Sequence, residues 1–350
     1  MRVTLSDETI QGQPRWGLNY GFSREINEAL KRNVISVRFW KGSKTARPLW
    51  HIPRSRIAVG DVATALRGVG AQLAVPKSIS ERALGPMRHD ECGRMDFPFS
   101  NMQPWDHQSH GTSAMATLPG FLAAWDMGSG KTKAVYDLIV NSDIRRALVV
   151  CPFTVCEVWE NEREKHGGVG GPEIRVQRLD KRRPDRKVSL LQKAIEAGTV
   201  NNAPVIVVIN YESVWTGKIA EAILDVEWDL IVADESHRIK SPKSKSTKWM
   251  ATKLAHRGKR RVGLSGTPLG NGQQDIFGQA WFLDPGLFGD SWPKFRDRYF
   301  ETNPMFNSKV ERCKDPEGFS QRLEMICTSV SLKDVVDLPP TRDIKVEVEL

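Results

Sequence analysis

The chain of 350 residues is 40% hydrophobic and 27% charged, and its net charge is +9. This composition is typical of a folded globular protein with room for one α/β domain of about 200–250 residues and a smaller module. No run of about 18 apolar residues occurs, and the first residues carry no apolar signal segment. We therefore expect neither a membrane-spanning protein nor a secreted one. The five cysteines are scattered without a C-x-x-C pair. We therefore expect reduced thiols, no membrane partner, and a cytoplasmic (nucleoid) or nuclear location.

The first 75 residues alternate short helical and strand-like patterns, which predict a small α+β module at 1–75. Four segments carry these patterns, helix-like at 23–32 and 59–70 and strand-like at 34–40 and 48–52. Trp40 and Trp50 are interleaved with basic residues, which fits either the core of a small domain or a surface that grips nucleic acid. Residues 76–103 lack periodicity and are rich in helix breakers, so we predict a linker there.

From residue 104 to residue 346, apolar runs alternate with segments long enough for helices. The runs are short, rich in Val, Ile and Leu, and without polar alternation, as is typical of strands buried on both faces. They occupy residues 120–126, 146–152, 203–211, 228–235 and 260–267. The alternation predicts an α/β fold with a parallel sheet and helices on both faces. Ligands of such sheets bind beyond the carboxyl ends of the strands.

A glycine-rich segment follows the first of these runs and precedes a helical pattern. Glycines let backbone N–H groups turn toward a phosphate, and the following helix adds the positive end of its dipole. Lys131 is placed to reach the β- and γ-phosphates, and the Thr132 hydroxyl to bind Mg²⁺. Trp125 stands where the strict pattern has one more glycine. We predict an ATP-binding loop that comprises Asp126, Met127, Gly128, Ser129, Gly130, Lys131 and Thr132.

Two carboxylates, Asp234 and Glu235, end the fourth apolar run. We expect Asp234 to hold Mg²⁺ through water, and Glu235 to orient and deprotonate the attacking water, with Lys131 as the other catalytic residue. A solvated acidic turn is the alternative. His237 follows in the same D-E-S-H segment, and beside the acidic pair we interpret it as a relay between nucleotide and nucleic acid.

The fifth apolar run leads into Ser265 and Thr267. These two small hydroxyl residues are able to hydrogen-bond to the acidic segment, so we predict that movement of one segment is felt by the other. A simple Gly/Pro turn is the alternative.

The stretch from Arg238 to Arg261 contains ten Lys or Arg residues and no acid. Such a stretch favours a polyanion, and its contribution to binding falls as salt rises. We take Lys240 and Lys243 as the candidate DNA contacts in it. A solvated basic face is the alternative.

The order of these segments resembles the first motor lobe of the Swi/Snf-like ATPases in helicase superfamily two. The resemblance is carried by DMGSGKT, VVCPFTVCEVWENE, VIVVINYESV, DESHRIK, GLSGTPLGN and WFLDPGLFGDSWPKFRDRYF. It runs from about residue 104 to about residue 346, and it implies a RecA-like lobe that grips double-stranded DNA and, in full-length members, translocates along it using ATP. The N-terminal zone is more loosely similar to the HARP-type modules of annealing-helicase relatives, which bind nucleic acid.

The resemblance also assigns residue roles. It implies that Gln108 reads the adenine, and that Pro152 and Thr154 touch the DNA backbone. The family usually has an Asp-Glu pair before the loop, where this chain has Trp125 and Asp126. This exchange leaves the phosphate cradle intact and changes the packing beside it.

Motors of this kind hold ATP between two RecA-like lobes, and arginines of the second lobe are worth about 10³–10⁵ in rate in related enzymes. The sequence stops where the resemblance places that second lobe. We therefore expect a chain that binds ATP with Mg²⁺ and DNA but hydrolyses ATP slowly, with a second RecA-like lobe on another chain as a candidate partner. Alternatives are a strand-separating or annealing helicase, a non-catalytic ATP-gated DNA-binding adaptor, and a metabolic P-loop kinase.

Overall fold

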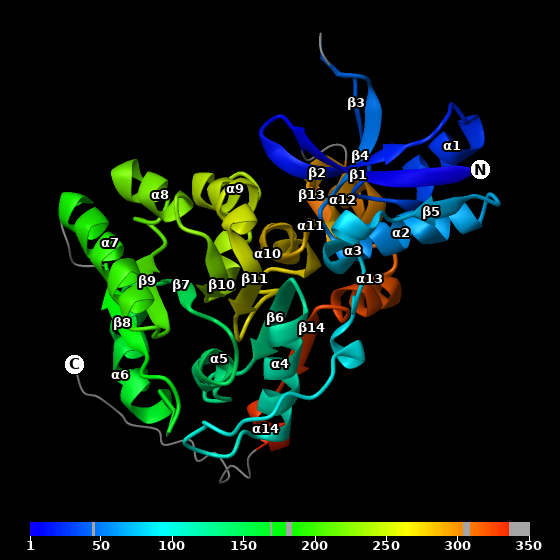
Figure 1. Ribbon diagram of the computed structural model, residues 1–350. Coiled ribbons are helices and arrows are strands. Elements are labelled where there is room, and N and C mark those ends of the chain that lie inside the picture. Colours follow the sequence, from blue (N-terminus) through cyan, green and yellow to red (C-terminus); the bar gives the residue numbers. More distant parts are fainter. Residues whose placement is uncertain (44–45, 169, 180–183, 304–308, 336–350) are drawn as a thin grey trace.

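The structure is a computed structural model that describes residues 1–43, 46–168, 170–179, 184–303 and 309–335. Within these ranges the strands form three sheets of five, seven and two members (Figure 1). No helix in the described ranges is long and apolar enough to cross a bilayer.

The N-terminal sheet has the strand order β3-β4-β2-β1-β5. Its strands are β1 (Arg2–Ile10), β2 (Gln13–Asn19), β3 (Arg38–Trp40), β4 (Leu49–Pro53) and β5 (Gln72–Ala74). Helices α1 (Arg24–Asn33) and α2 (Arg56–Arg67) begin after Ser23 and Ser55, whose hydroxyls accept backbone N–H groups of the first turn. Strands and helices enclose an apolar cluster of their own.

The central sheet has the order β14-β6-β11-β10-β7-β9-β8, and neighbouring strands are parallel. Its strands are β6 (Gly120–Trp125), β7 (Arg146–Cys151), β8 (Arg175–Arg178), β9 (Val205–Asn210), β10 (Trp228–Asp234), β11 (Gly258–Leu264) and β14 (Cys327–Val330). Asp234 pairs with Leu264, and Leu264 pairs with Ala123. The carboxyl ends of β10, β11 and β6 are therefore level at one edge. The predicted parallel α/β fold is confirmed, and β8 and β14 are additions to it.

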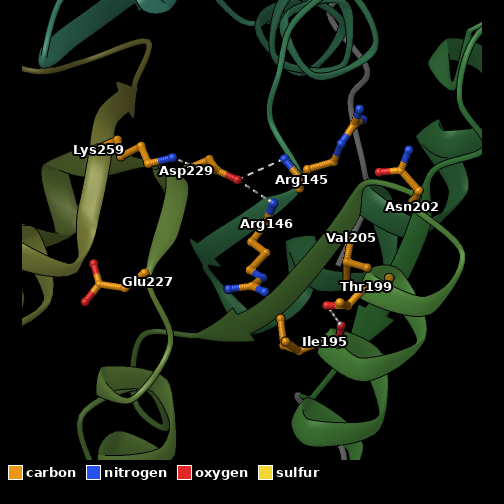
Figure 2. A pocket seen from close by; sticks show the side chains of 10 residues that line it. Arg145, Arg146, Ile195, Thr199, Asn202, Val205, Glu227, Asp229 and Lys259 are labelled. Carbon is orange, nitrogen blue, oxygen red and sulfur yellow. Dashed lines mark hydrogen bonds and ion pairs between the residues drawn. The ribbon is translucent and has the colours of Figure 1, made fainter.

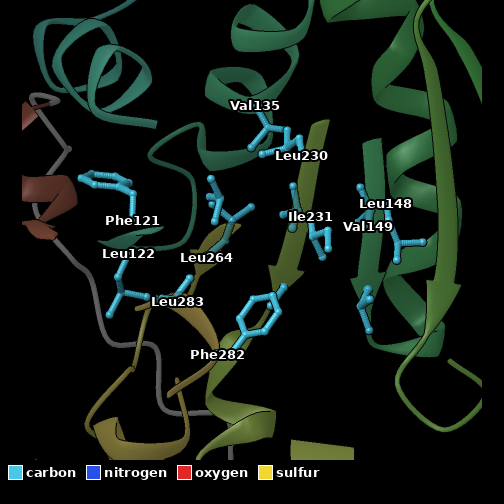
Figure 3. Packing of buried hydrophobic residues seen from close by; sticks show 14 of the residues in the cluster. Phe121, Leu122, Val135, Leu148, Val149, Leu230, Ile231, Leu264, Phe282 and Leu283 are labelled. Carbon is cyan, nitrogen blue, oxygen red and sulfur yellow. The ribbon is translucent and has the colours of Figure 1, made fainter. Parts of the chain in front are cut away.

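Helices cover both faces of this sheet (Figure 1). On one face lie α4 (Asp106–Thr117), α5 (Lys131–Val140) and α6 (Cys156–His166). On the other lie α7 (Pro184–Val200), α8 (Gly217–Leu224), α9 (Lys245–Thr252) and α10 (Ile276–Leu283). Fully buried aliphatic and aromatic side chains fill the space between sheet and helices (Figure 3). This packing holds the strand ends, and hence the loops after them, in fixed relative positions.

The N-terminal sheet is docked on the segment that follows α10, which contains α11 (Pro285–Phe288), α12 (Trp292–Tyr299) and α13 (Pro316–Leu323) (Figure 1). Arg15 and Arg38 each lie 2.6 Å from a carboxylate oxygen of Asp290, and Arg322 lies 2.7 Å from Asp61. The antiparallel hairpin of β12 (Phe300–Asn303) and β13 (Lys309–Cys313) follows α12 and precedes α13 in the chain.

The segment at 76–103 is attached to the central lobe along much of its length. It contains α3 (Lys77–Ala83) and a 3-10 turn at His89–Glu91. The backbone N–H of Met95 donates to Ser113 Oγ at 3.0 Å, and that of Phe99 donates to Asn141 Oδ1 at 3.0 Å. Hydrogen bonds of this kind are not part of a periodic pattern, which is why the sequence indicated only a linker.

Candidate active site

The glycine-rich loop joins β6 to α5, and two of its glycines have backbone angles that favour glycine. Gly128 has φ +83° and Gly130 has φ +82°, in the left-handed region that costs other residues about 1–2 kcal/mol. A Cβ on Gly130 would also lie 2.2 Å from Gln108 Nε2. With no side chain on either glycine, the backbone of the turn is open next to the N-terminus of α5, where N–H groups and the helix dipole favour an anion.

Gln108 fixes this loop to α4. Its Nε2 donates to the carbonyl oxygen of Ser129 at 3.0 Å, and its Oε1 accepts the backbone N–H of Trp105 at 3.0 Å. The side chain is only 3% exposed, while Ser129 Oγ closes the loop by donating to the carbonyl of Asp126 at 2.7 Å. Gln108 thus supports the loop that the sequence predicts as a phosphate cradle, and its role in reading adenine stays a prediction.

The Lys131 side chain folds back onto the start of the same loop. Its Nζ donates to the carbonyl oxygens of Trp125 and Asp126 at 2.7 and 3.0 Å. Burial lowers the pKa of this lysine, while the carboxylates of Glu235, Asp234 and Asp126 act in the opposite direction. The ammonium group of the loop and the acidic pair therefore share one electrostatic environment.

Asp234 is a buried carboxylate at the carboxyl end of β10. Its side chain accepts Trp159 Nε1–H at 2.8 Å on one oxygen and the backbone N–H of Glu235 at 2.9 Å on the other. The residue is only 6% exposed. Burial raises the pKa of Asp234 to about 6, against the lowering effect of the Trp159 hydrogen bond. Thr132 is the second residue of α5, and its hydroxyl together with this buried acid would supply oxygen ligands of the kind that Mg²⁺ prefers.

Glu235 has an unusual backbone conformation, with φ 52° and ψ 53°. Residues other than glycine rarely adopt this region, and such conformations cluster at functional sites. Glu235 Oε2 lies 3.2 Å from His237 Nδ1, and the same nitrogen lies 3.2 Å from Ser265 Oγ. Ser265 Oγ in turn accepts the backbone N–H of Thr267 at 3.2 Å. The two segments expected to communicate are thus in contact through His237 and Ser265, and Thr267 takes part through its backbone.

Gln279 forms a second bridge between these segments, which the sequence patterns did not predict. It is fully buried on α10. Its Oε1 accepts from Ser236 Oγ at 2.7 Å, while its Nε2 donates to the carbonyls of Pro268 and Asp275 at 2.8 and 3.1 Å. The sequence feature that could have identified Gln279 is its position as the single polar residue in the apolar run IFGQAWFL. Trp159 was missed in a similar way, as the one large aromatic residue in a highly charged helix.

The expected DNA contacts after β7 are split between the interior and the surface. Pro152 is buried, whereas Thr154 is exposed in the 3-10 turn Phe153–Val155. This turn follows β7, whose carboxyl end lies at the same edge as that of β10. Thr154 is the better placed of the two, and both contacts stay predictions.

The basic stretch from Arg238 to Arg261 also divides into two groups. Six members make internal contacts, among them Lys240, whose Nζ lies 3.0 Å from Asp275 Oδ2. The other five are Arg238, Arg257, Lys259, Arg260 and Arg261. Lys243, Lys245, Lys248 and Lys253, within or next to α9, are exposed and have no acidic partner in the described part of the chain. These four lysines are the part of the stretch that is free to meet a polyanion.

A hollow of about 290 Å³ lies at the opposite, amino edge of the sheet (Figure 2). Its central carboxylate, Asp229, accepts the backbone N–H groups of Arg145 and Arg146 at 2.9 and 3.1 Å, and Lys259 Nζ at 2.7 Å. These donors already satisfy the carboxylate. The hollow therefore lies at the amino ends of the strands and offers no unsatisfied charge. The candidate site lies at the carboxyl ends of the strands.

Comparisons with known proteins identify the family and the fold. A family model described as the SNF2-related domain matches residues 24–350. The chain is 27% identical over 323 residues to "Protein CHROMATIN REMODELING 20" of Arabidopsis thaliana, covering 83% of this chain and 20% of the relative. It is 30% identical over 266 residues to the human "Transcriptional regulator ATRX", covering 66% of this chain and 10% of the relative.

Among solved structures, the "Sulfolobus solfataricus SWI2/SNF2 ATPase core in complex with dsDNA" superposes with a TM-score of 0.53 at 23% identity. The match covers 68% of this chain and 47% of that chain, and it shows that the fold is shared. The chain thus spans less than half the length of each of these three relatives.

Proposed function

The chain belongs to the SNF2-related family of DNA-dependent ATPases, and from this premise we propose that it is the ATP-binding lobe of a translocase on double-stranded DNA. The observation that supports the proposal is that the loop before Lys131 and the pair Asp234 and Glu235 follow strands that end at one edge of the central sheet, with these carboxylates acting on the pKa of Lys131. The proposed task is of the remodelling or fork/annealing type, in the compartment that holds the DNA. Two relatives named above are a chromatin remodelling protein and a transcriptional regulator by their names, which supports the remodelling task.

ATP and Mg²⁺ are the cofactors that these residues fit. The turn at Gly128 and Gly130 would surround the phosphates with backbone N–H groups, and Lys131 would leave its carbonyl partners for the phosphate oxygens. Thr132 and Asp234 would hold Mg²⁺, which neutralises phosphate charge when it is bound.

Glu235 is the group proposed to orient and deprotonate the attacking water. His237 lies beside Glu235 and contacts Ser265, so a shift of the loop after β11 changes the surroundings of the base. This contact supports a path by which bound DNA alters hydrolysis, with Ser265 and Thr267 in the coupling segment.

DNA is proposed to bind over Thr154 and over the exposed lysines around the start of α9, with Lys243 among them. Slow hydrolysis by this chain alone follows from the expectation that arginines of a second RecA-like lobe complete the site. That lobe is a proposed partner, on whichever chain it is carried.

The test is the substitution Glu235→Gln, which keeps the shape of the side chain and removes the base. ATP binding with Mg²⁺ should be retained, and residual hydrolysis should disappear, measured with saturating double-stranded DNA. Hydrolysis that persists in the variant contradicts the assigned base. Fast DNA-stimulated turnover by the unsubstituted chain alone contradicts the need for a second lobe, and ATP-dependent DNA binding without any turnover identifies an adaptor instead.

A further inference from the structure

The N-terminal sheet carries an aromatic groove that the nucleotide site does not use. It is a hollow of about 740 Å³ between the end of α1 and the strands β2, β3 and β4. Four aromatic residues line it, namely Tyr20, Phe22, Phe39 and Trp50. We call these residues, with Asn27, Lys31 and Arg47, the aromatic groove.

Strand register explains how the rings come together. Phe39 pairs with Trp50 across β3 and β4, so the two side chains share one face of the sheet, with ring centroids 5.1 Å apart. Trp40, the next residue of β3, points to the other face. The tryptophan pair suggested by the sequence, Trp40 and Trp50, is therefore not the pair that lines one surface.

Two of the rings are open to solvent although they are apolar. Phe22 is 90% exposed and Phe39 is 51% exposed. Large exposed aromatic side chains gathered at one hollow mark binding surfaces more often than isolated exposed residues do. A ligand with a planar ring could stack on these two exposed aromatic rings and remove them from water.

The polar ends of the other two rings are fixed. Asn27 Oδ1 accepts from Trp50 Nε1 at 2.7 Å and from Tyr20 Oη at 2.8 Å. One turn further along α1, Lys31 Nζ lies 5.6 Å from the centre of the Trp50 ring. The groove is thus preorganised, since its rings and its nearest cation are held by contacts within the protein.

The charge of the lining has one sign. Among the described residues that line the hollow, Lys31 and Arg47 are the ionisable ones apart from Tyr20, and none of them carries a carboxylate. Stacking rings beside cations match a chain of unpaired bases joined by phosphates, because every base offers a flat face and every phosphate a negative charge. A neutral, proline-rich peptide matches the rings alone.

We propose that the aromatic groove binds single-stranded DNA, with bases stacked on Phe39 and Phe22 and phosphates beside Lys31 and Arg47. This site is separate from the proposed binding of duplex DNA to the ATPase lobe and does not depend on it. It gives the protein contacts to both duplex and unpaired strands, on two different sheets.

The experiment measures the affinity of the full chain for a fluorescein-labelled dT15 oligonucleotide and for a duplex, by anisotropy and without nucleotide. Phe39→Ala and Phe39→Leu should each weaken dT15 binding by about 5- to 150-fold, the effect of removing the stacking of one base. Duplex affinity should be unchanged. Leucine keeps the apolar volume, so weaker binding in both variants assigns the effect to the ring.

Charge is tested with Lys31→Gln, which should reduce the dependence of log K on log salt by about 0.7, the value for one phosphate that is no longer neutralised. The matched control is Lys193→Gln, a neutralisation of an exposed lysine on α7, which should leave dT15 binding as in the unsubstituted protein. ATP binding measured on the same preparations keeps the two proposals distinguishable.

Four results would overturn this inference. The first is dT15 binding by Phe39→Ala as tight as that of the unsubstituted protein. The second is an equal weakening of dT15 and duplex binding. The third is tighter binding of rU15 than of dT15, which makes RNA the partner. The fourth is a proline-rich peptide that binds the groove while dT15 does not.

Discussion

The hydrogen bond from Trp159 to Asp234 is the contact whose removal tests the metal site most sharply. A hydrogen bond to a charged group contributes about 1.5–3 kcal/mol, which corresponds to about 1–2 pKa units. Phe in place of Trp159 keeps the ring beside Tyr136 and removes the donor. Since the pKa of Asp234 is about 6, the substitution Trp159→Phe should raise it to between about 7 and 8.

The sign follows from the charge state that binds the metal. A protonated Asp234 cannot hold Mg²⁺, so affinity for ATP with Mg²⁺ falls as pH drops through the pKa of the carboxyl. At pH 7 the variant should bind about 2- to 10-fold more weakly than the unsubstituted protein, and at pH 9 the two should agree. Fluorescence titration with a labelled ATP analogue between pH 5.5 and 9 measures this directly.

The control is Trp228→Phe. Trp228 is equally buried, and its Nε1 donates to the carbonyl of Ile223 at 3.0 Å, away from the acidic pair. This variant loses a comparable hydrogen bond and should keep the pH profile of the unsubstituted protein. A folded Trp159→Phe variant whose profile coincides with that of the unsubstituted protein refutes the reasoning.

Two other substitutions test the coupling segment and the basic surface. Gln279→Leu leaves Ser236 and the carbonyls that Gln279 now caps without a partner, which should cost about 1–3 kcal/mol in free energy of unfolding. It should also abolish stimulation of ATP hydrolysis by DNA while ATP binding remains. Neutralising Lys243, Lys245 and Lys248 together should reduce the salt dependence of duplex binding by about 2.7, at about 0.9 for each phosphate that is no longer neutralised.

Control variants test whether these two effects are specific to the residues that were changed. Gln279→Glu keeps the acceptor for Ser236 and removes the donor to Pro268, so it separates the two halves of the bridge. Stimulation by DNA that survives Gln279→Leu removes this residue from the coupling path. Arg257→Gln and Lys259→Gln change residues already paired with Glu227 and Asp229, and an equal decrease in salt dependence there would contradict the division of the basic stretch.

Much of the central lobe was predictable because it depends on local patterns. The five apolar runs became β6, β7, β9, β10 and β11, since strands buried on both faces show their character in sequence. The loop before Lys131 and the carboxylates of Asp234 and Glu235 both follow such strands. Parallel strands end at a common edge, so their meeting followed from topology.

The unpredicted features depend on tertiary contacts that leave no periodic signal. Strand β14 has a polar, short sequence and joins the sheet only by pairing with β6. Burial of Trp159 and Gln279 depends on the side chains packed against them from other elements. Half of the basic residues between Arg238 and Arg261 are paired with acids far along the chain, which the sequence does not reveal. The shared face of Phe39 and Trp50 required the strand register, which the sequence does not contain.

The central claim is that the phosphates of ATP lie between the loop before Lys131 and the pair Asp234 and Glu235. The most direct measurement is a crystal structure with a non-hydrolysable ATP analogue and Mn²⁺, which marks the metal by its anomalous scattering. We predict an anomalous peak between the Thr132 hydroxyl and the Asp234 carboxylate, with Lys131 turned from its carbonyl partners to the phosphates. A metal peak and nucleotide at any other place, such as the hollow around Asp229, would contradict the claim.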